Sequence, residues 1–423
     1  MGDERPEATA PGSDAPGAHD VPGDLARRQP ISVDAASLPA TGAWRPGQPV
    51  GDRQFVSSPP GRRFLLEGGG HLPGVEIAYE TWGTLASDKS NAVLVCHALT
   101  GDSHAAGHAG VGHQAVGWWD DVIGPGRALD TDELFVVCAN VLGGCQGSTG
   151  PATIDPDGRP WGRRFPVVSI RDMVRAQAMV ADHLGVTRWR SVVGGSMGGM
   201  QVLEWALMYP ERVGSIVPIA TTVAASAQQI AYSSVQRFAI ALDPAFAGGD
   251  YYDAPPGGGP HRGLALAREI AQITYRSDEV FQDRFGRGVV DPIDDAFALW
   301  QRFDVEGYLD YHGAKLVRRF DANSYLTICK AMDLHDIGRG RAGAAAAMAR
   351  LRCPVLVMSI TSDALYPPWQ QRQIRDLVTQ VGGRCELVDI DSPHGHDAFL
   401  LEEEQVGDAL RKFLQHVEDR PGA

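Results

Sequence analysis

The sequence is poor in cysteine and has no closely spaced cysteine pair. Only six cysteines occur among 423 residues, and no two of them form a Cys-x-x-Cys arrangement. This scarcity argues against a disulfide framework and against a thiolate zinc site, and it fits a reducing compartment. The six are Cys96, Cys138, Cys145, Cys329, Cys353 and Cys385.

Long apolar runs and an excess of positive charge are also missing. No apolar stretch reaches the roughly 18 residues that a membrane span needs. The first residues, MGDERPEATAPGSDAPG, contain no apolar segment of the kind that marks a secretory signal. The formal net charge of −14 disfavours nucleic acids and anionic membranes as partners. We therefore expect a cytoplasmic protein that binds no nucleic acid and no membrane.

Recognisable phosphate-binding and metal-binding motifs are absent as well. The sequence has no Gly-x-x-x-x-Gly-Lys-Ser/Thr loop. His104, His108 and His113 are close in sequence, but they lack His-Glu-x-x-His spacing and lie in a stretch rich in glycine and alanine. We expect these histidines to be solvated or bonded locally, and we expect no metal and no permanently bound cofactor.

Glycine, in contrast, is abundant, and one glycine-rich stretch is the most informative part of the chain. Ser196 lies within Gly-Gly-Ser-Met-Gly-Gly at 194–199, after a strand-like run at 189–193 and before a helical pattern at 200–209. Strand, Gly-x-Ser-x-Gly and helix together form a nucleophile elbow. Its glycines permit a sharp turn, and the helix N-terminus favours negative charge beside the hydroxyl. An ordinary glycine-rich turn is the alternative.

The rest of the chain alternates strand-like and helical segments, with one interruption. Residues 1–52 are rich in Pro, Gly, Ala and Asp, which predicts a disordered N-terminal arm. Residues 53–221 and 346–423 predict an α/β core with a mostly parallel sheet flanked by helices. Residues 222–345 predict a helical lid insertion. Strands are expected at 63–67, 75–79, 91–96, 134–139, 215–219, 354–360 and 386–390, and helices at 171–184 and 402–417.

A serine nucleophile needs a base that is oriented by a carboxylate, and the chain offers both after late strands. Asp363 follows the strand at 354–360, and His396 follows the strand at 386–390. The order Ser, Asp, His is that of α/β-hydrolases. His394 competes with His396 as the base, because spacing alone does not separate them. Asp363 also fits a solvated turn.

Two backbone N–H groups are expected to stabilise the oxyanion. One belongs to Met197, the residue after the nucleophile, and the other comes from the loop after an early strand. The segment His-Ala-Leu-Thr-Gly at 97–101 follows the strand at 91–96, so Leu99 is the second candidate.

Several stretches resemble the homoserine O-acyltransferases. The resemblance extends from about residue 54 to the C-terminus. It is carried by 96–104 (Cys-His-Ala-Leu-Thr-Gly-Asp-Ser-His), 140–151 (Asn-Val-Leu-Gly-Gly-Cys-Gln-Gly-Ser-Thr-Gly-Pro), 194–199, 321–325 (Asp-Ala-Asn-Ser-Tyr), 335–340 (His-Asp-Ile-Gly-Arg-Gly) and 395–400 (Gly-His-Asp-Ala-Phe-Leu). It implies an α/β-hydrolase fold with a helical lid and a homodimer built through the lid helices. It also implies ping-pong acetyl transfer from acetyl-CoA to the hydroxyl of L-homoserine, in methionine biosynthesis.

The same resemblance implies roles for individual residues. It selects His396 rather than His394 as the base. Arg268 matches the arginine that holds the substrate carboxylate, and Asp397 matches the carboxylate for the substrate amine. Tyr275 and Thr100 match further substrate contacts. Arg237 also lies in the expected lid, where it is interpreted as a solvated helix charge.

Other functions remain open on this scaffold. Succinyl transfer would need an additional cation near Ser196, which the sequence does not reveal. Serine instead of homoserine as acceptor, a serine esterase that uses water, and a binding protein without activity are further alternatives. The site rather than the fold must distinguish them. The Gly-Gly-Cys-Gln-Gly-Ser-Thr-Gly-Pro stretch at 143–151 favours the acetyl donor by resemblance, and the intact Ser-Asp-His order argues against an inactive protein.

Overall fold

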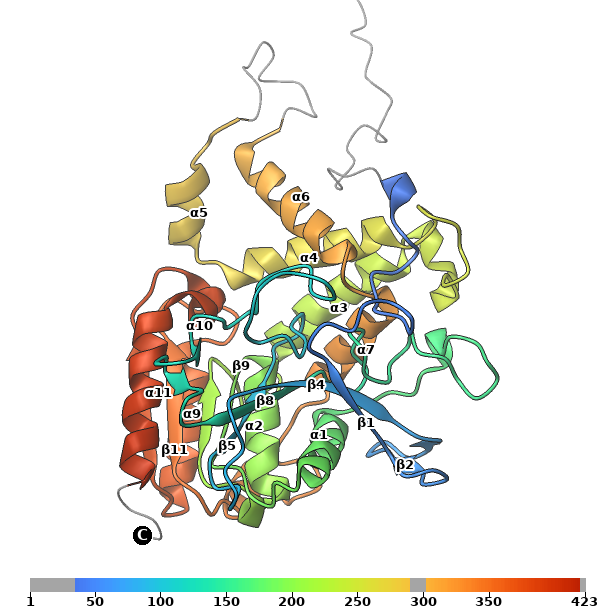
Figure 1. Cartoon of the computed structure of the whole chain (residues 1–423). Helices are drawn as coiled ribbons and strands as arrows, with labels where there is room; N and C mark the ends of the chain where they lie inside the picture. Colours follow the sequence, from blue (N-terminus) through green and yellow to red (C-terminus); the bar gives the residue numbers. More distant parts are fainter. Residues whose placement is uncertain (1–34, 290–301, 419–423) are drawn as a thin grey trace, which may run out of the picture.

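The computed structural model describes residues 35–289 and 302–418. An eight-stranded sheet forms the centre of the described chain, in the order β1-β4-β8-β5-β9-β10-β11-β12 (Figure 1). The pairs β1–β4 and β4–β8 are antiparallel, and the remaining neighbours are parallel. The strands are β1 (Gln54–Ser57), β4 (Glu76–Trp82), β5 (Ala92–Cys96), β8 (Phe135–Ala139), β9 (Ser191–Gly195), β10 (Ile216–Ile219), β11 (Val355–Ile360) and β12 (Cys385–Ile390).

Apolar side chains cover both faces of this sheet. In β5, Ala92, Leu94 and Cys96 join one core, whereas Val93 and Val95 join the other, because successive side chains in a strand point to opposite faces. The first core also contains residues of α1 (Ile170–Leu184), α2 (Met197–Met208) and α9 (Pro368–Gln380). The second contains residues of α11 (Glu403–Glu418). Burial on both faces explains why the central strands are continuous apolar runs.

Local signals in the sequence define the helix ends. Ser169 and Asp172 form a capping box at the start of α1, and Gly185 ends that helix with φ of 68°. The predicted helices at 171–184 and 402–417 are thereby confirmed to within two residues. The predicted strand at 63–67 is confirmed only at its centre, where the two-residue β2 (Phe64–Leu65) pairs with β3 (His71–Leu72) outside the central sheet.

Helices fill the stretch between β10 and β11. They are α3 (Ala227–Ala241), α4 (His261–Tyr275), α5 (Asp278–Phe285), α6 (Asp304–Val317), α7 (Ala322–Asp333) and α8 (Ala344–Met348). α3, α4 and α6 lie above the sheet in the view of Figure 1. Smaller elements are β6 (Ile123–Gly124), β7 (Leu129–Asp130), α10 (Ala398–Leu401), and 3-10 turns at Ala35–Ser37, Gly162–Arg164, Pro210–Arg212, Pro244–Gly249 and Gly395–Asp397.

The segment before β1 differs from the expected disordered arm. Residues 1–34 of that arm lie outside the described residues, but Ala40, Thr41 and Ala43 are buried. The Thr41 hydroxyl donates a 2.8 Å hydrogen bond to Asp321, which is fully buried. The ordered chain therefore begins well before residue 53, because a few small residues suffice to fill the space beside α7. The average composition of residues 1–52 does not reveal these few buried residues.

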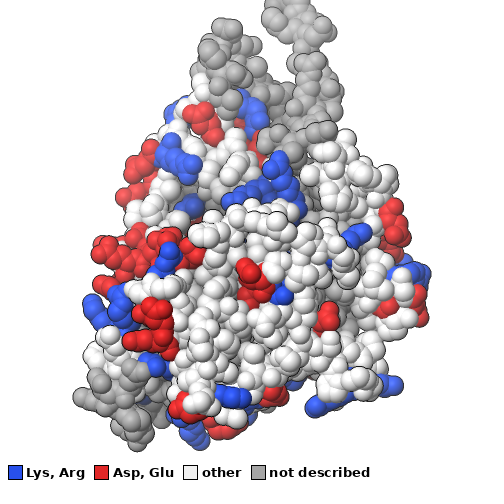
Figure 2. All heavy atoms as spheres, in the orientation of Figure 1, with Lys and Arg blue, Asp and Glu red and all other residues white. Residues whose placement is uncertain are grey.

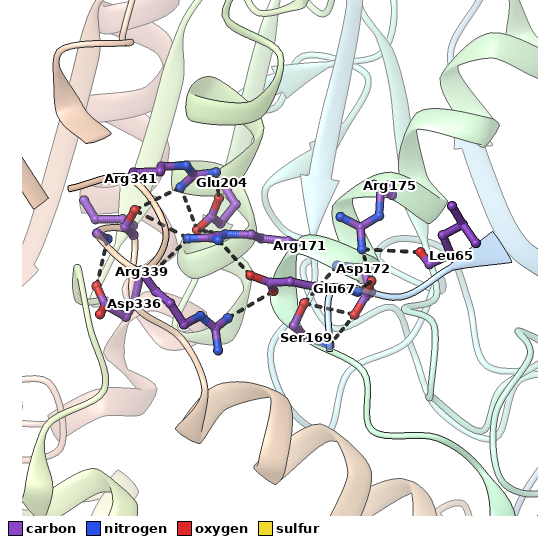
Figure 3. A network of polar contacts seen from close by, with 12 residues as sticks. Leu65, Glu67, Ser169, Arg171, Asp172, Arg175, Glu204, Asp336, Arg339 and Arg341 are labelled. Atoms are coloured by element: carbon purple, nitrogen blue, oxygen red, sulfur yellow. Dashed lines mark hydrogen bonds and ion pairs between the residues drawn. The ribbon is translucent and has the colours of Figure 1, made fainter. Parts of the chain in front are cut away.

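A buried ionic network connects the chain that leaves the helical insertion to the core (Figure 3). Glu204 of α2 is 1% exposed and accepts hydrogen bonds from Arg171 of α1 at 3.0 Å and from Arg341 at 2.6 Å. Arg171 also donates to Glu67 at 2.7 Å, and Arg339 bonds the other oxygen of Glu67 at 3.0 Å. Removing one partner of such a network leaves a buried charge unpaired, so the loop is firmly held.

Within 35–289 and 302–418, no helix is both long and apolar enough to cross a bilayer.

Candidate active site

The predicted elbow forms a strained turn at the carboxyl end of β9. Ser196 has φ of 58° and ψ of −124°, outside the regions that L-residues ordinarily adopt, and it immediately precedes α2. A Cβ on Gly198 would lie 2.1 Å from the Cys96 carbonyl oxygen, and one on Gly195 would lie 2.5 Å from the Phe399 ring. Both positions therefore require glycine. Thr221 donates a 2.8 Å hydrogen bond to the Ser196 carbonyl oxygen and steadies the turn.

Asp363 and His396 meet at the carboxyl ends of two neighbouring strands, β11 and β12. The Nδ1 atom of His396 lies 2.7 Å from Oδ2 of Asp363, and both side chains are buried. Oδ1 of Asp363 accepts the N–H groups of Leu365 and Tyr366 at 2.9 and 2.8 Å. These two bonds fix the carboxylate, which in turn orients the imidazole.

His394 lies elsewhere. Its side chain is 41% exposed, and its Nε2 atom is 4.0 Å from Glu402 rather than near Asp363. The geometry thus pairs the acid with His396 and leaves His394 at the surface.

The surroundings of His396 determine its protonation. Burial alone lowers the pKa of His396, but the charge and hydrogen bond of Asp363, together with Asp397, outweigh it and raise the pKa above its usual value. Tyr366 stacks on the imidazole at 5.0 Å between ring centroids, and the rings of Phe399 and Tyr275 lie at 5.6 and 5.9 Å. With these rings around it, the His396 side chain is buried.

The two expected oxyanion donors lie at neighbouring strand ends. In the described chain, the N–H groups of Leu99 and Met197 donate to no protein acceptor, and both residues are buried. The loop after β5 is anchored by His97. Its Nδ1–H group donates to the Ala98 carbonyl oxygen at 2.8 Å, and its Nε2 atom accepts the Val141 N–H at 3.0 Å. Free N–H groups at this position suit a developing oxyanion.

The residues expected to bind substrate gather beside His396, with one exception. The Arg268 guanidinium lies over the Tyr275 ring at 5.2 Å, and burial raises the pKa of Tyr275 to about 12. Asp397 follows the base and forms a 3.3 Å ion pair with Arg276. Thr100 is the exception. Its backbone carbonyl oxygen, rather than its side chain, makes the observed contact, a 2.6 Å hydrogen bond donated by Arg319. Arg237 is not a free surface charge, since it pairs with Asp333.

The histidine-rich stretch forms a hydrogen-bonded cluster. Glu80 bonds His104 at 2.8 Å and lies 3.5 Å from His113, and His108 is exposed. The His104 and His113 rings stack at 3.7 Å with planes 9° apart. A metal ion lies in the plane of each imidazole that binds it, and two nearly parallel rings at this spacing share no such point. The cluster as placed suits hydrogen bonding to a shared carboxylate.

Sequence reasoning missed three residues of this site. Tyr366 covers the base, Arg276 neutralises Asp397, and Ser362 donates to the Ser392 carbonyl oxygen at 2.5 Å while accepting the Gly395 N–H at 2.9 Å. The available signal was closeness in sequence, of Tyr366 and Ser362 to Asp363 and of Arg276 to Tyr275. The pairing of Arg276 with Asp397 had no signal, because only the folded chain brings these two residues together.

Comparisons with known proteins identify the fold and the family of the chain. A family described as alpha/beta hydrolase fold matches residues 91–403. A homoserine O-acetyltransferase of Thermobifida fusca is 53% identical over 378 residues, covering 89% of this chain and 97% of the relative. One from Leifsonia xyli is 53% identical over 380 residues, covering 89% and 92%.

Solved structures give the same fold. The homoserine O-acetyltransferase of Bacillus anthracis superposes with a TM-score of 0.79 at 28% identity, covering 86% of this chain and 97% of that one. Esterase E22 superposes with a TM-score of 0.77 at 28% identity, covering 86% and 99%. The chain combines an eight-stranded α/β sheet and a nucleophile elbow with 53% identity to the Thermobifida fusca and Leifsonia xyli enzymes, and it therefore belongs to the homoserine O-acetyltransferase family of the α/β-hydrolase fold.

Proposed function

We propose that this protein transfers an acetyl group from acetyl-CoA to the hydroxyl of L-homoserine, giving O-acetyl-L-homoserine and CoA in methionine biosynthesis. The observation that carries the proposal is the position of Arg268 and Asp397 beside the His396–Asp363 pair. A zwitterionic amino acid needs a fixed cation and a fixed anion, and a guanidinium offers a planar fork to a carboxylate.

The proposed reaction is a ping-pong cycle. In the first half, His396 accepts the Ser196 proton as the oxygen attacks the thioester carbon. The Leu99 and Met197 amides hold the oxyanion, the C–S bond breaks, and the CoA sulfur takes the proton from His396. In the second half, His396 accepts the homoserine hydroxyl proton while that oxygen attacks the acyl carbon. The bond to Ser196 then breaks and its oxygen regains the proton.

A small cavity supports acetyl rather than succinyl as the acyl group. It has a volume of about 40 Å³ and is lined on one side by Leu99 and Tyr366. A volume of this size is enough for an acetyl methyl group, whereas the longer succinyl chain with its terminal carboxylate would need more space.

Acyl transfer and ester hydrolysis differ in what attacks the acyl-enzyme. The helical insertion packs against the loop that carries the base, since Ser277 bonds the Pro393 carbonyl oxygen. We propose that the insertion acts as a lid that excludes water from the acyl-enzyme. Esterase activity is the second candidate, because esterase E22 superposes about as well as the homoserine O-acetyltransferase of Bacillus anthracis.

The test is a crossed assay of acetyl-CoA and succinyl-CoA with L-homoserine and L-serine, with a no-acceptor reaction that measures hydrolysis. We expect rapid CoA release only with acetyl-CoA and homoserine. CoA release at the same rate without an acceptor would favour the esterase. Faster release with succinyl-CoA would make succinyl-CoA the donor, and faster release with L-serine would make serine the acceptor.

We further propose a homodimer formed through the helical insertion, in a cytoplasmic protein. Exposed apolar side chains on two contacting helices support it: Val235, Phe238 and Leu242 at α3, and Leu266 and Ile273 on α4. Apolar side chains clustered on a surface commonly mark a protein interface.

A further inference from the structure

A cavity of about 460 Å³ lies on the other side of the oxyanion loop and is lined by four cationic residues. They are Arg53, Lys315, Arg318 and Arg319. Lys and Arg side chains gather in the upper centre of Figure 2, at the end of α6. Among the described residues, Asp102 is the one acidic residue that lines the cavity, and it is already paired with Arg319 at 3.5 Å. The chain as a whole has a net charge of −14, so the positive charge at this cavity is a local feature that opposes the overall charge.

Two of these cations are available to a ligand. Lys315 and Arg318 are exposed, and within the described residues neither forms an ion pair or a side-chain hydrogen bond.

Two indole rings face the same cavity. Trp44 and Trp118 both line it and are half-buried. Each ring is fixed by its N–H group, which donates to the Pro49 carbonyl oxygen and to the Asp102 carbonyl oxygen respectively, at 3.0 Å in both cases. Fixed aromatic faces beside phosphate-binding cations are the features by which proteins hold a nucleotide base and its phosphates.

The cationic cavity and the small cavity beside Tyr366 are lined by the same short loop, residues 99–102. Gly101 and Asp102 line the cationic cavity, whereas Leu99 lines the small cavity beside Tyr366. Arg319 ties the two together, since it donates to the Thr100 carbonyl oxygen at 2.6 Å. A ligand that spans both cavities would have an anionic, aromatic end and a small acyl end.

We propose that the cationic cavity binds the phosphorylated adenosine end of the acyl-CoA donor, with Lys315 and Arg318 on the phosphates and Trp44 or Trp118 on the adenine. This assignment rests on the proposed function for the identity of the donor. In this arrangement the nucleotide lies in the cavity lined by Gly101 and Asp102. The thioester lies at the Leu99 end of the same loop, where it reaches Ser196.

The experiment compares the double variant Lys315→Ala/Arg318→Ala with a control of equal charge change, Lys412→Ala/Arg350→Ala, whose residues are exposed and far from the cavity lining. Acylation of Ser196 is measured with acetyl-CoA and with S-acetylpantetheine, which has the same thioester but no nucleotide. We expect the cavity variant to raise the KM for acetyl-CoA at least tenfold and to leave S-acetylpantetheine unchanged. Equal KM values for acetyl-CoA in all three proteins would overturn the assignment.

Direct binding separates this assignment from the proposed function. Adenosine 3′,5′-bisphosphate is titrated into each protein by calorimetry, without any turnover. Binding to the parent and control that weakens at least tenfold in the cavity variant supports the site, even if acetyl-CoA proves not to be the donor. Equal binding by all three, or none by the parent, contradicts it. If acetyl-CoA fails to acylate Ser196 although the nucleotide binds, the proposed function fails and the site remains.

Discussion

Two histidines two residues apart, His394 and His396, lie in different surroundings, and this difference is testable. We expect His396→Ala to lower kcat by several orders of magnitude, because a triad base has no substitute. His394→Ala should change kcat little, because its ring is 41% exposed and 4.0 Å from Glu402. Steady-state rates of CoA release for both variants check this. If His394→Ala were inactive, the role of general base would have to be assigned to His394.

The raised pKa of His396 also predicts a pH profile. The base works only when neutral, so kcat/KM should rise with pH through a midpoint above the usual histidine value of about 6.5. The stability effect has the opposite sign. Because the folded pKa exceeds the unfolded one, protonated His396 stabilises the fold at pH below the unfolded pKa, and this contribution is lost as pH rises through the folded pKa. Rate profiles of the parent and of Asp363→Asn test the cause, since the variant should have a lower midpoint.

Arg268 should matter for one half-reaction only. A charge-assisted pair that loses one partner costs roughly 2–5 kcal/mol, so Arg268→Ala should reduce kcat/KM for homoserine by well over tenfold. Acetylation of Ser196 should persist, because the donor has no amino-acid carboxylate. A stopped-flow acylation trace beside a homoserine titration separates the two. If acylation and homoserine transfer were reduced equally, Arg268 would instead support the packing of the helical insertion.

At the scale of elements, the buried residues at 40–43, before β1, allow a specific prediction about truncation. Removal of residues 1–34 should leave stability unchanged, since their composition offers little apolar surface to bury. Removal of residues 1–43 should lower Tm measurably, because the buried Ala40 and Ala43 are lost together with the hydrogen bond from Thr41 to Asp321, and such a bond contributes about 0.5–1.5 kcal/mol. Calorimetric scans of the two truncated proteins give the comparison. The same Tm for both would mean that residues 40–43 contribute nothing.

Periodic and motif-bearing elements were predictable from the sequence, whereas contacts between distant segments were not. Buried runs such as 91–96 and 354–360 gave β5 and β11 almost to the residue. β1 was missed because its four residues, Gln54–Ser57, are too few to show a period and only edge pairing with β4 defines them. The pairing of Arg276 with Asp397 needed the folded chain.

At the scale of the whole molecule, the proposed dimer can be broken at one position. Phe238 is 64% exposed, at the centre of the apolar patch on α3. Phe238→Glu should shift the mass measured by light scattering from two chains to one, because a desolvated carboxylate is costly at an interface. Leu65→Glu is the matched control, since Leu65 is 69% exposed on the β2 hairpin. A Phe238→Glu protein of unchanged mass would place the interface elsewhere.

The order in which the parts of the site occur along the chain has a consequence for synthesis on the ribosome. Ser196 and the loop of Leu99 emerge first, Asp363 follows much later, and His396 comes 33 residues after its acid partner. Every nascent chain that ends between residues 196 and 395 thus contains the nucleophile without its base. On the proposed mechanism such a fragment cannot take an acetyl group from acetyl-CoA, so an interrupted translation product neither consumes the donor nor releases acetate. Activity begins only when the last strand and its loop have joined the sheet.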